Sequence, residues 1–210
     1  MNCRFCNTQL RYCFVSLGSA PLSNSYLTKE QLHSAEMFYP LDVYVCENCF
    51  LAQLDSCESP THIFSDYAYF SSYSGTWLKH AKYYVDKVTR IFEIKNQSSV
   101  IEIASNDGYL LQYFVEKGIP VLGIEPAVNV AMAAREKGIP TEVCFFGALT
   151  AKRLTNEGKY ADLLLGNNVL AHVTDLNDFV DGLKILLKPR GVITMEFPHL
   201  MKLMDENQFD

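Results

Sequence analysis

The chain has 210 residues, of which 49% are apolar and 20% charged, and its formal net charge is -6 at pH 7. This composition is typical of a globular protein with a buried core, and the negative charge disfavours binding to nucleic-acid phosphates. No apolar run reaches the roughly 18 residues that span a bilayer, and the first residues lack the apolar stretch of a secretory signal. We therefore expect a cytoplasmic protein that binds neither nucleic acid nor membrane, in a compartment where thiols stay reduced.

Two Cys-x-x-Cys pairs mark the N-terminal region, Cys3 with Cys6 and Cys46 with Cys49, and a strand is expected at 40–45 between them. Four thiolates suffice to close a tetrahedral zinc site, and two intervening residues let one turn aim both sulfurs at the same ion. A redox dithiol or two chance pairs are the alternatives, and the shared spacing favours a structural Zn²⁺. The remaining cysteines are expected to be small buried side chains: Cys13, Cys57 and Cys144.

A linker and a helix are expected over residues 57–97. From about Thr76, apolar residues recur at three- and four-residue steps, which is the pattern of a helix that packs on a neighbouring domain. The aromatic and serine-rich stretch before it contains Tyr69 and Ser72. It stands where a chain that enters an α/β domain could lie across the ligand cleft.

From residue 98 onward, short apolar strands alternate with helical segments. This alternation predicts a Rossmann-like α/β fold, a parallel sheet with helices on both faces, whose ligands bind beyond the carboxyl ends of the strands. The expected strands are 98–105, 120–126, 140–146, 160–168 and 191–198, and the expected helices are 107–118, 127–138, 147–159 and 176–191.

The first of these strands runs into a turn, Glu102-Ile-Ala-Ser-Asn-Asp-Gly108, where a glycine-rich sequence normally lets the backbone approach a nucleotide. Ala104 and Asn106 occupy the first two glycine places, which disfavours a dinucleotide pyrophosphate and hence a nicotinamide dehydrogenase. S-adenosylmethionine carries no phosphate, so this turn suits it better. Glu125 ends the second strand, where a carboxylate accepts hydrogen bonds from ribose hydroxyls.

Five motifs in order resemble the sugar C-methyltransferases, a family that acts on nucleotide-linked 4-keto-deoxysugars. The motifs are the cysteine pairs, Tyr69-Phe-Ser-Ser72, the Glu102–Gly108 turn, Gly123-Ile-Glu-Pro126 and Gly166-Asn-Asn-Val-Leu-Ala-His-Val173. The resemblance covers the chain from the first cysteine pair to its end. It implies a class I methyltransferase sheet with a small N-terminal zinc-binding module. The implied segments are a zinc-binding module at 1–56, a linker and helix over the cofactor cleft at 57–97 and a cofactor-binding domain at 98–210.

In this family a base removes the proton alpha to the 4-keto group, and the enolate carbon attacks the cofactor's methyl group. The resemblance thus implies a nucleotide-sugar substrate, with S-adenosylmethionine and Zn²⁺ as cofactors and Cys3, Cys6, Cys46 and Cys49 as zinc ligands. His172 would face the substrate as a base, and Glu196 and His199 would line the sugar pocket, although the family usually has Tyr at position 199. The implied cofactor-binding residues are Tyr69, Ser72, Glu102, Ala104, Ser105, Asn106, Gly108, Glu125, Pro126, Phe146, Gly147, Asn167 and Asn168.

Plainer roles compete with two of these assignments: Asn168 as a helix cap and His172 as a surface or core histidine. A sheet of this class normally has seven strands, and family members continue with a Tyr-His-Glu-His segment that supplies the base and with a further nucleotide-binding domain. Because five strands are expected here, we predict a truncated chain that binds cofactor and turns over little alone. Its oligomeric state is left open, and exposed sheet edges would favour pairing with another chain, including a homo-oligomer. The alternatives are a methyltransferase for another small molecule and a non-catalytic zinc-ribbon module with a cofactor-binding domain.

Overall fold

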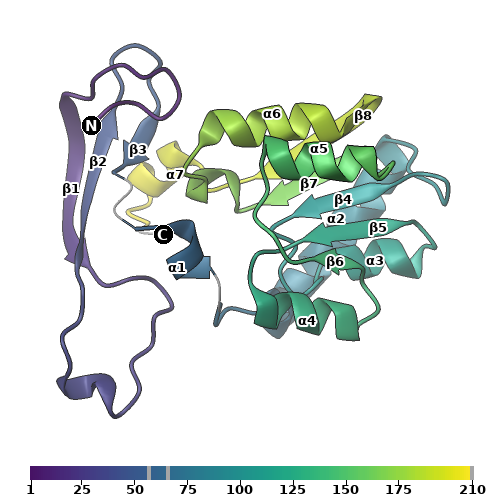
Figure 1. The fold of residues 1–210 in the computed structure, drawn as a ribbon, viewed down its shortest axis with the longest axis horizontal. Helices are drawn as coiled ribbons and strands as arrows, with labels where there is room; N and C mark the ends of the chain where they lie inside the picture. Colours follow the sequence, from purple (N-terminus) through teal and green to yellow (C-terminus); the bar gives the residue numbers. More distant parts are fainter. Residues whose placement is uncertain (56–57, 65–66, 209–210) are drawn as a thin grey trace. The chain divides into compact units, whose positions relative to one another are not determined.

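A computed structural model describes residues 1–55, 58–64 and 67–208. The chain falls into two compact units, residues 1–69 with 174–177 and residues 70–173 with 178–210. Figure 1 shows an antiparallel sheet in the first unit and a parallel sheet in the second. The expected segment boundaries at 56/57 and 97/98 stay predictions.

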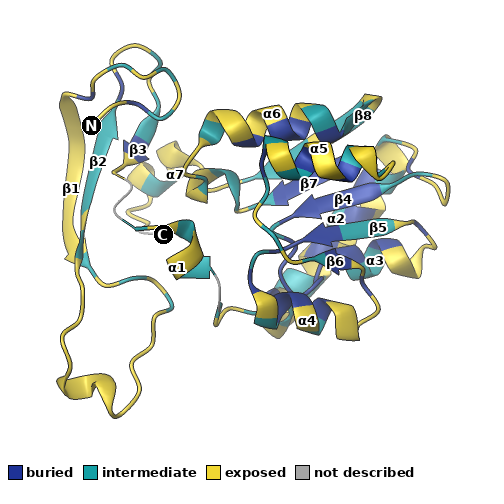
Figure 2. Cartoon of the chain, viewed as in Figure 1, coloured by how far each residue is buried: buried dark blue, intermediate teal, exposed yellow. Residues whose placement is uncertain are grey.

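The first unit is built on a three-stranded antiparallel sheet in the order β1-β2-β3, and the strand expected at 40–45 is its central strand β2. Its buried apolar cluster consists of Cys3, Leu10 and Cys46, so little of this unit is shielded from water (Figure 2). The elements of the unit are β1 (Tyr12–Ala20), η1 (Gln31–His33), β2 (Tyr39–Val45), β3 (Ala52–Leu54) and α1 (Pro60–Phe64).

The expectation that the spare cysteines are buried is wrong for Cys13, which is exposed on β1. β1 is an edge strand whose residues are almost all exposed, because this small sheet has too little chain to cover both of its faces. Cys144 is half-buried beside the second unit's core, where burial raises the pKa of its thiol. Cys57 lies outside the described residues.

The second unit has a five-stranded parallel sheet in the order β6-β5-β4-β7-β8, which confirms the predicted Rossmann-like α/β fold. The chain runs outward from β4 through β5 to β6 and then returns to β7 and β8 on the other side. The strand order therefore reverses between β4 and β7, where open α/β sheets bind their ligands. The strands are β4 (Val100–Ile103), β5 (Val121–Ile124), β6 (Thr141–Glu142), β7 (Ala161–Asn167) and β8 (Leu187–Glu196).

Helices cover both faces of this sheet (Figure 1). Along β4, Val100 belongs to one apolar cluster and Ile101 to the other, because successive side chains of a strand point to opposite faces. The first cluster is covered by α2 (Gly75–Ile91), α3 (Leu111–Glu116) and α4 (Val128–Glu136), and the second by α5 (Ala148–Asn156) and α6 (Leu176–Leu186).

The helix predicted from about Thr76 is α2, whose N-cap Ser74 accepts a hydrogen bond from the amide of Trp77 at 3.2 Å. Ala81 and Val88 of the expected apolar stripe are buried, together with Val85, whereas Ile91 at its end is 53% exposed. Preceding it is the short 3-10 turn η2 (Ser71–Tyr73), and later in the chain come the 3-10 turn η3 (Leu170–His172) and the short helix α7 (Leu200–Asp205). Among the described helices, none has both the length and the apolar character that crossing a membrane requires.

Several predicted boundaries are wrong, among them the start of the helix expected from residue 107, which begins at Leu111. The helix expected to reach residue 191 ends at Leu186, and β8 begins at once with Leu187. Pro189 explains this, because proline disfavours helical backbone at the residue before it and lacks the amide that a helix interior requires. The strand expected at 140–146 is only Thr141–Glu142, since β6 is the sheet edge and pairs with β5 alone.

Candidate functional site

The two cysteine pairs of the first unit are held by the same pattern of backbone hydrogen bonds. Cys3 O accepts from Asn7 N at 2.9 Å, and Cys46 O accepts from Phe50 N at 2.9 Å. The amides of the two first cysteines donate onward to Thr8 O at 2.8 Å and to Leu51 O at 3.1 Å. Asn7 and Phe50 both adopt left-handed backbone, with φ of 60° and 62°. Each pair is therefore one copy of the same tight turn, with both sulfurs on its inner side.

The four thiols fit a tetrahedral zinc ion. All four sulfur atoms lie within 4.8 Å of one another, with Cys3 and Cys49 at 3.6 Å and Cys6 and Cys46 at 3.5 Å. Zn–S bonds of about 2.3 Å in a tetrahedron place sulfurs about 3.8 Å apart, close to this spacing. Hydrogen bonds with Thr8 lower the pKa of the Cys6 thiol to about 5, whereas burial and the other three thiols raise the pKa of Cys49 to about 12.

A buried side chain supports this sulfur cluster from outside. Gln53 Nε2 donates to Cys3 Sγ at 3.2 Å, and Gln53 Oε1 accepts from Arg4 N at 2.9 Å. Such second contacts orient metal ligands. The sequence carried no signal for Gln53, because it lies on β3, which was not predicted.

In the second unit, strand register brings predicted site residues from four strands to one edge. Ile103 pairs with Ile124 and with Gly166, and Asn167 pairs with Glu196. Four predicted site residues consequently follow or end neighbouring strands at the carboxyl edge of the sheet: Ala104, Glu125, Asn167 and Glu196. This is the edge at which parallel α/β sheets bind ligands.

The turn after β4 has the backbone conformation of a glycine-rich turn although two glycines are replaced. Ala104, Asn106 and Gly108 have φ of 55°, 50° and 74°, so all three glycine places are left-handed. Alanine is disfavoured there by about 1–2 kcal/mol. Ala104 and Asn106 therefore keep the backbone shape of a glycine-rich turn and store strain in it. Strained backbone concentrates at functional sites.

Gly108 is needed for space as well as for conformation. A Cβ at this position would meet Ile139 Cδ1 at 2.2 Å, so the connection from α4 to β6 lies directly against the turn. This explains why Gly108 remains while the other two glycine places are filled.

Glu125 is fixed by the same turn. Its carboxylate accepts from Asn106 N and from Ala127 N, each at 2.9 Å, and the residue is 5% exposed. Burial raises the pKa of this carboxyl, and the two amides counteract the rise. Each oxygen retains a further lone pair, which is the capacity that two ribose hydroxyls need.

Unpaired polar atoms gather beside Glu125. Both Glu102 carboxyl oxygens, Ser105 Oγ and Asp107 Oδ1 are buried and have no hydrogen-bond partner among the residues that the structure describes. Burial raises the pKa of Glu102 well above its ordinary value, and the nearby charges of Glu125 and Asp107 raise it further. Buried orphan acceptors require donors, and the ammonium of S-adenosylmethionine supplies such donors. The residues present therefore fit this cofactor.

An aromatic stack borders the same edge. Trp77 stacks on His80 and on Tyr109, with ring centroids 5.1 Å and 6.0 Å apart. Asn167 Nδ2 donates to Tyr109 Oη at 3.1 Å, which orients its amide carbonyl. His80 Nε2 lies 3.7 Å from Glu196 Oε2, so α2 brings a histidine to the predicted substrate residue. The sequence had pointed to the apolar stripe of α2 but not to this pair.

Ser72 contacts the turn through a lysine rather than directly. Its Oγ accepts from Lys137 Nζ at 2.8 Å, while the amide of Ser71 donates to Asn106 Oδ1 at 2.9 Å. Tyr69 is the last residue of the first unit's N-terminal segment and is 49% exposed. Its predicted contact with cofactor stays a prediction.

The remaining predicted residues lie around the later strands of the second unit. Phe146 packs edge-on against Phe179 at 5.4 Å, and a Cβ on Gly147 would meet Asp178 Oδ2 at 2.0 Å. Asn168 has φ of 50° and does not cap η3, whose N-cap is Val169. Most of these residues are not buried: Phe146 and Pro126 are half-buried, and Asn168, His172 and His199 are exposed.

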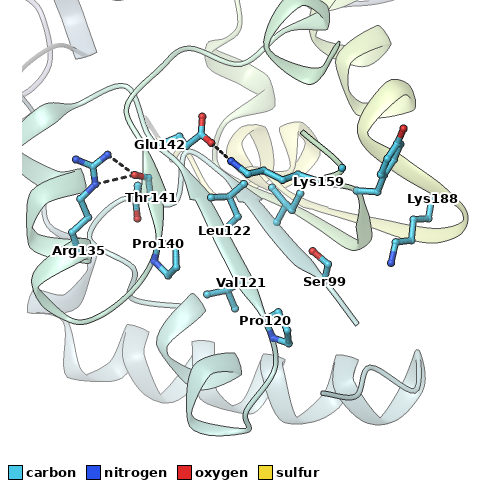
Figure 3. Close-up of a pocket in the computed structure, with 13 residues that line it drawn as sticks. Ser99, Pro120, Val121, Leu122, Arg135, Pro140, Thr141, Glu142, Lys159 and Lys188 are labelled. Atoms are coloured by element: carbon cyan, nitrogen blue, oxygen red, sulfur yellow. Dashed lines mark hydrogen bonds and ion pairs between the residues drawn. The ribbon is translucent and has the colours of Figure 1, made fainter. Parts of the chain in front are cut away.

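A pocket of about 620 Å³ lies at the opposite, amino edge of the sheet (Figure 3). Its cations already have acceptors: Lys159 pairs with Glu142 at 2.6 Å, and Arg135 donates to Thr141 O at 2.6 and 2.9 Å. Because it is far along the strands from the Glu102–Gly108 turn, this pocket does not belong to the candidate cofactor site.

Two families match the chain. One, described as "Putative zinc binding domain", matches residues 3–64, and the other, described as "Methyltransferase domain", matches residues 76–208. The second match covers more than half of the chain.

Known proteins show similarity of two extents. The C-methyltransferase NovU of Streptomyces niveus is 33% identical over 208 residues, which are 99% of this chain and 50% of that protein. The ubiquinone biosynthesis O-methyltransferase of Bartonella tribocorum is 28% identical over 95 residues, which are 45% of this chain and 38% of that protein. The chain thus spans half or less of the length of these curated relatives.

Among solved structures, the PH0226 protein of Pyrococcus horikoshii OT3 is similar in fold. The TM-score is 0.53 at 19% identity, over 66% of this chain and 62% of that chain. With the family matches, the zinc-fitting thiols and the turn that fits the cofactor, the chain belongs to the S-adenosylmethionine-dependent methyltransferases and carries an N-terminal zinc-binding domain.

Proposed function

We propose that this protein methylates a carbon atom of a nucleotide-linked keto-deoxysugar. The observation that carries the proposal is the 33% identity to a C-methyltransferase, which extends over 99% of the chain and so includes both units. The carbon acceptor follows from that relative's name, and the sugar follows from the motif resemblance in the sequence.

The proposed cofactor contacts use groups that the turn has already oriented. Glu125 would accept hydrogen bonds from the ribose hydroxyls through the lone pairs that the amides of Asn106 and Ala127 leave. The orphan oxygens of Glu102 and the oriented amide of Asn167 would receive the ammonium of the methionine end. Phe146 and Gly147 would flank the adenine.

When bound, S-adenosylmethionine supplies an electrophilic methyl group on a sulfonium. The protein's task is to remove a proton from the acceptor carbon, whose electron pair then forms the bond to the methyl carbon while the carbon–sulfur pair returns to sulfur. We propose that His172 faces the substrate and takes part in this proton transfer, because it is exposed on η3, directly after β7 at the carboxyl edge. Glu196 and His199, which follow the neighbouring strand, would line the sugar pocket.

A hydroxyl acceptor is the second candidate. The matches to ubiquinone biosynthesis O-methyltransferases favour it, but they cover 45% of the chain. Carbon methylation rests on a match of more than twice that extent.

Calorimetry with S-adenosylmethionine tests the cofactor site. Glu125→Ala should weaken binding about 10- to 100-fold, since it removes hydrogen bonds to a charged acceptor. Glu136→Ala removes an exposed carboxylate from α4 of the same unit and should leave affinity unchanged. Equal affinity in wild type and Glu125→Ala would refute the site.

Methyl-transfer assays test the acceptor. A nucleotide-linked 4-keto-deoxysugar should accept a labelled methyl group on carbon, whereas phenols should not. We expect residues 1–210 alone to bind cofactor and turn over little. Rapid turnover by this chain would overturn that expectation, and methylation of phenols instead would favour the hydroxyl acceptor.

We also propose a cytoplasmic location, where the four thiols stay reduced, and pairing of two copies through β8. This strand has β7 as its partner among the described strands, and an open strand edge favours association. Native mass measurement at several protein concentrations should show a dimer.

A further inference from the structure

We propose that Lys137 is a positioning residue that latches residues 70–73, here called the strap, onto the Glu102–Gly108 turn and thereby sets cofactor affinity without touching the cofactor. The observation is a single ammonium group that joins the strap to the turn. The cofactor part of this inference rests on the proposed function, whereas the latch itself rests on contacts within the second unit alone.

The latch uses every donor of the lysine. Lys137 Nζ donates to Ser72 Oγ at 2.8 Å, to Asp107 O at 2.9 Å and to Asp107 Oδ2 at 3.0 Å. An ammonium has three N–H groups, so these acceptors satisfy it completely. The Asp107 side chain is 3% exposed and that of Lys137 is 35% exposed, so solvent screens this pair less than an ordinary surface ion pair.

The position of Lys137 follows from how α4 ends. Its amide donates to Ala134 O at 3.1 Å as the helix closes, and Gly138 then turns the chain with φ of 78°. Ile139 comes next and fills the space that a side chain on Gly108 would need. The close approach at Gly108 therefore brings the end of α4 to the turn and gives Lys137 its reach.

A second tie runs parallel to the first. Ser71 N donates to Asn106 Oδ1, and Asn106 N donates to Glu125 Oε2, each at 2.9 Å. Two consecutive strap residues are thus bound to two consecutive turn residues, and one of these ties leads directly to the predicted ribose-binding carboxylate.

The other contacts of the strap are mostly with itself. Tyr73 N donates to Phe70 O at 3.2 Å, the two rings lie 5.6 Å apart, and Tyr73 is 85% exposed. Loss of the lysine contact should therefore loosen the strap and the turn, and leave the Asn106 backbone amide, which donates to the Glu125 carboxylate, less well fixed.

Hydrogen exchange of the cofactor-free protein tests the latch. In Lys137→Met, which keeps the length of the side chain and removes the charge, the amides of residues 70–74 should exchange about 10- to 100-fold faster. The matched control is Lys117→Met: Lys117 also follows a helix, precedes the left-handed Gly118, and pairs with Asp86 at 2.6 Å with 39% exposure. Unchanged exchange at 70–74 in Lys137→Met would overturn the latch.

Calorimetry with S-adenosylmethionine tests the positioning role. Lys137→Met should raise Kd about 10-fold, while Lys117→Met should not change it. Ser72→Ala removes only the strap's acceptor, and its effects on exchange and Kd should fail to add to those of Lys137→Met, because both changes break the same contact. Faster exchange with an unchanged Kd would overturn the positioning role. If the wild type bound no cofactor, the proposed function would fail, and the exchange data would still decide the latch.

Discussion

The two units are stabilised in different ways. In the second unit, two apolar clusters enclose a sheet whose central strands are buried on both faces (Figure 2). The residues predicted to bind cofactor follow or end these strands. In the first unit, the buried cluster contains two of the four thiols themselves. In the first unit, residues expected to bind the metal therefore also form the buried core. In the second unit, the residues of the buried core and those predicted to bind cofactor are largely different.

Removal of one zinc ligand should show the largest effect. Cys46→Ser should unfold the first unit at 25 °C, because structural zinc contributes about 10 kcal/mol or more to the folding of such small domains. The second unit should keep its fold. Hydrogen exchange across residues 1–55 and 98–196, with metal analysis, would measure both. Cys13→Ser, on the exposed face of β1, is the control and should retain the metal; a second unit that melted with the first would break the comparison.

The reverse experiment removes apolar core from the second unit. Phe114, on α3, is 0% exposed, and Phe114→Ala should lower the free energy of unfolding of this unit by about 3–5 kcal/mol. The zinc content should stay the same. Leu149→Ala, at a position 83% exposed, should change stability by less than about 0.5 kcal/mol. Loss of metal in Phe114→Ala would show that the units depend on each other.

The pH dependence of stability should reveal the cost of the buried carboxyl. Burial, then Glu125 and Asp107, raise the pKa of Glu102 well above 4.5, so above pH 4.5 the folded state holds a proton that the unfolded state has lost. The free energy of unfolding must then fall as pH rises, by at most about 1.4 kcal/mol per pH unit. Glu102→Gln should flatten that slope in urea unfolding between pH 5 and 8, and exposed Glu136→Gln should not. The same slope in wild type and Glu102→Gln would contradict the assignment.

The smallest effect should come from the strained turn. Ala104→Gly relieves a left-handed alanine, a gain of about 1–2 kcal/mol, and adds chain entropy to the unfolded state, a loss of about 0.5–1 kcal/mol. We expect a net stabilisation of about 0.5–1 kcal/mol, measured as a higher guanidinium midpoint. Ala133→Gly, inside α4, should instead destabilise the protein by about 0.5–1 kcal/mol.

Much of the fold could be predicted from the sequence because its signals are local. The spacing of the cysteines predicted the thiol cluster, and the alternation of apolar strands with helices predicted the parallel sheet. The end of α6 was missed because the apolar pattern of 176–187 continues through the boundary, although Pro189 carried the signal. β3 and α7 are too short to have a recognisable period.

The candidate site was predictable where residues follow strands, as with Glu125 and Asn167, because register carries the ends of neighbouring strands to one edge. It was not predictable where the contact depends on tertiary packing. Lys137 lies 30 positions from Asp107, and only the close approach at Gly108 brings them together. The left-handed backbone at Ala104 contradicts the local preference of alanine. The sequence therefore shows that two glycines are missing from the turn, but not that the turn keeps its left-handed backbone.

The matching hydrogen-bond pattern of the two cysteine turns has a consequence for how the first unit tolerates change. Each turn is complete within six residues. The 39 residues between Cys6 and Cys46 therefore need only bring the second cysteine turn back to the first. The entropy of closing a flexible loop grows slowly, by about 0.6 kcal/mol for each doubling of its length. The excursion around residues 21–38 is therefore the place where insertions or deletions should be accepted without loss of the metal.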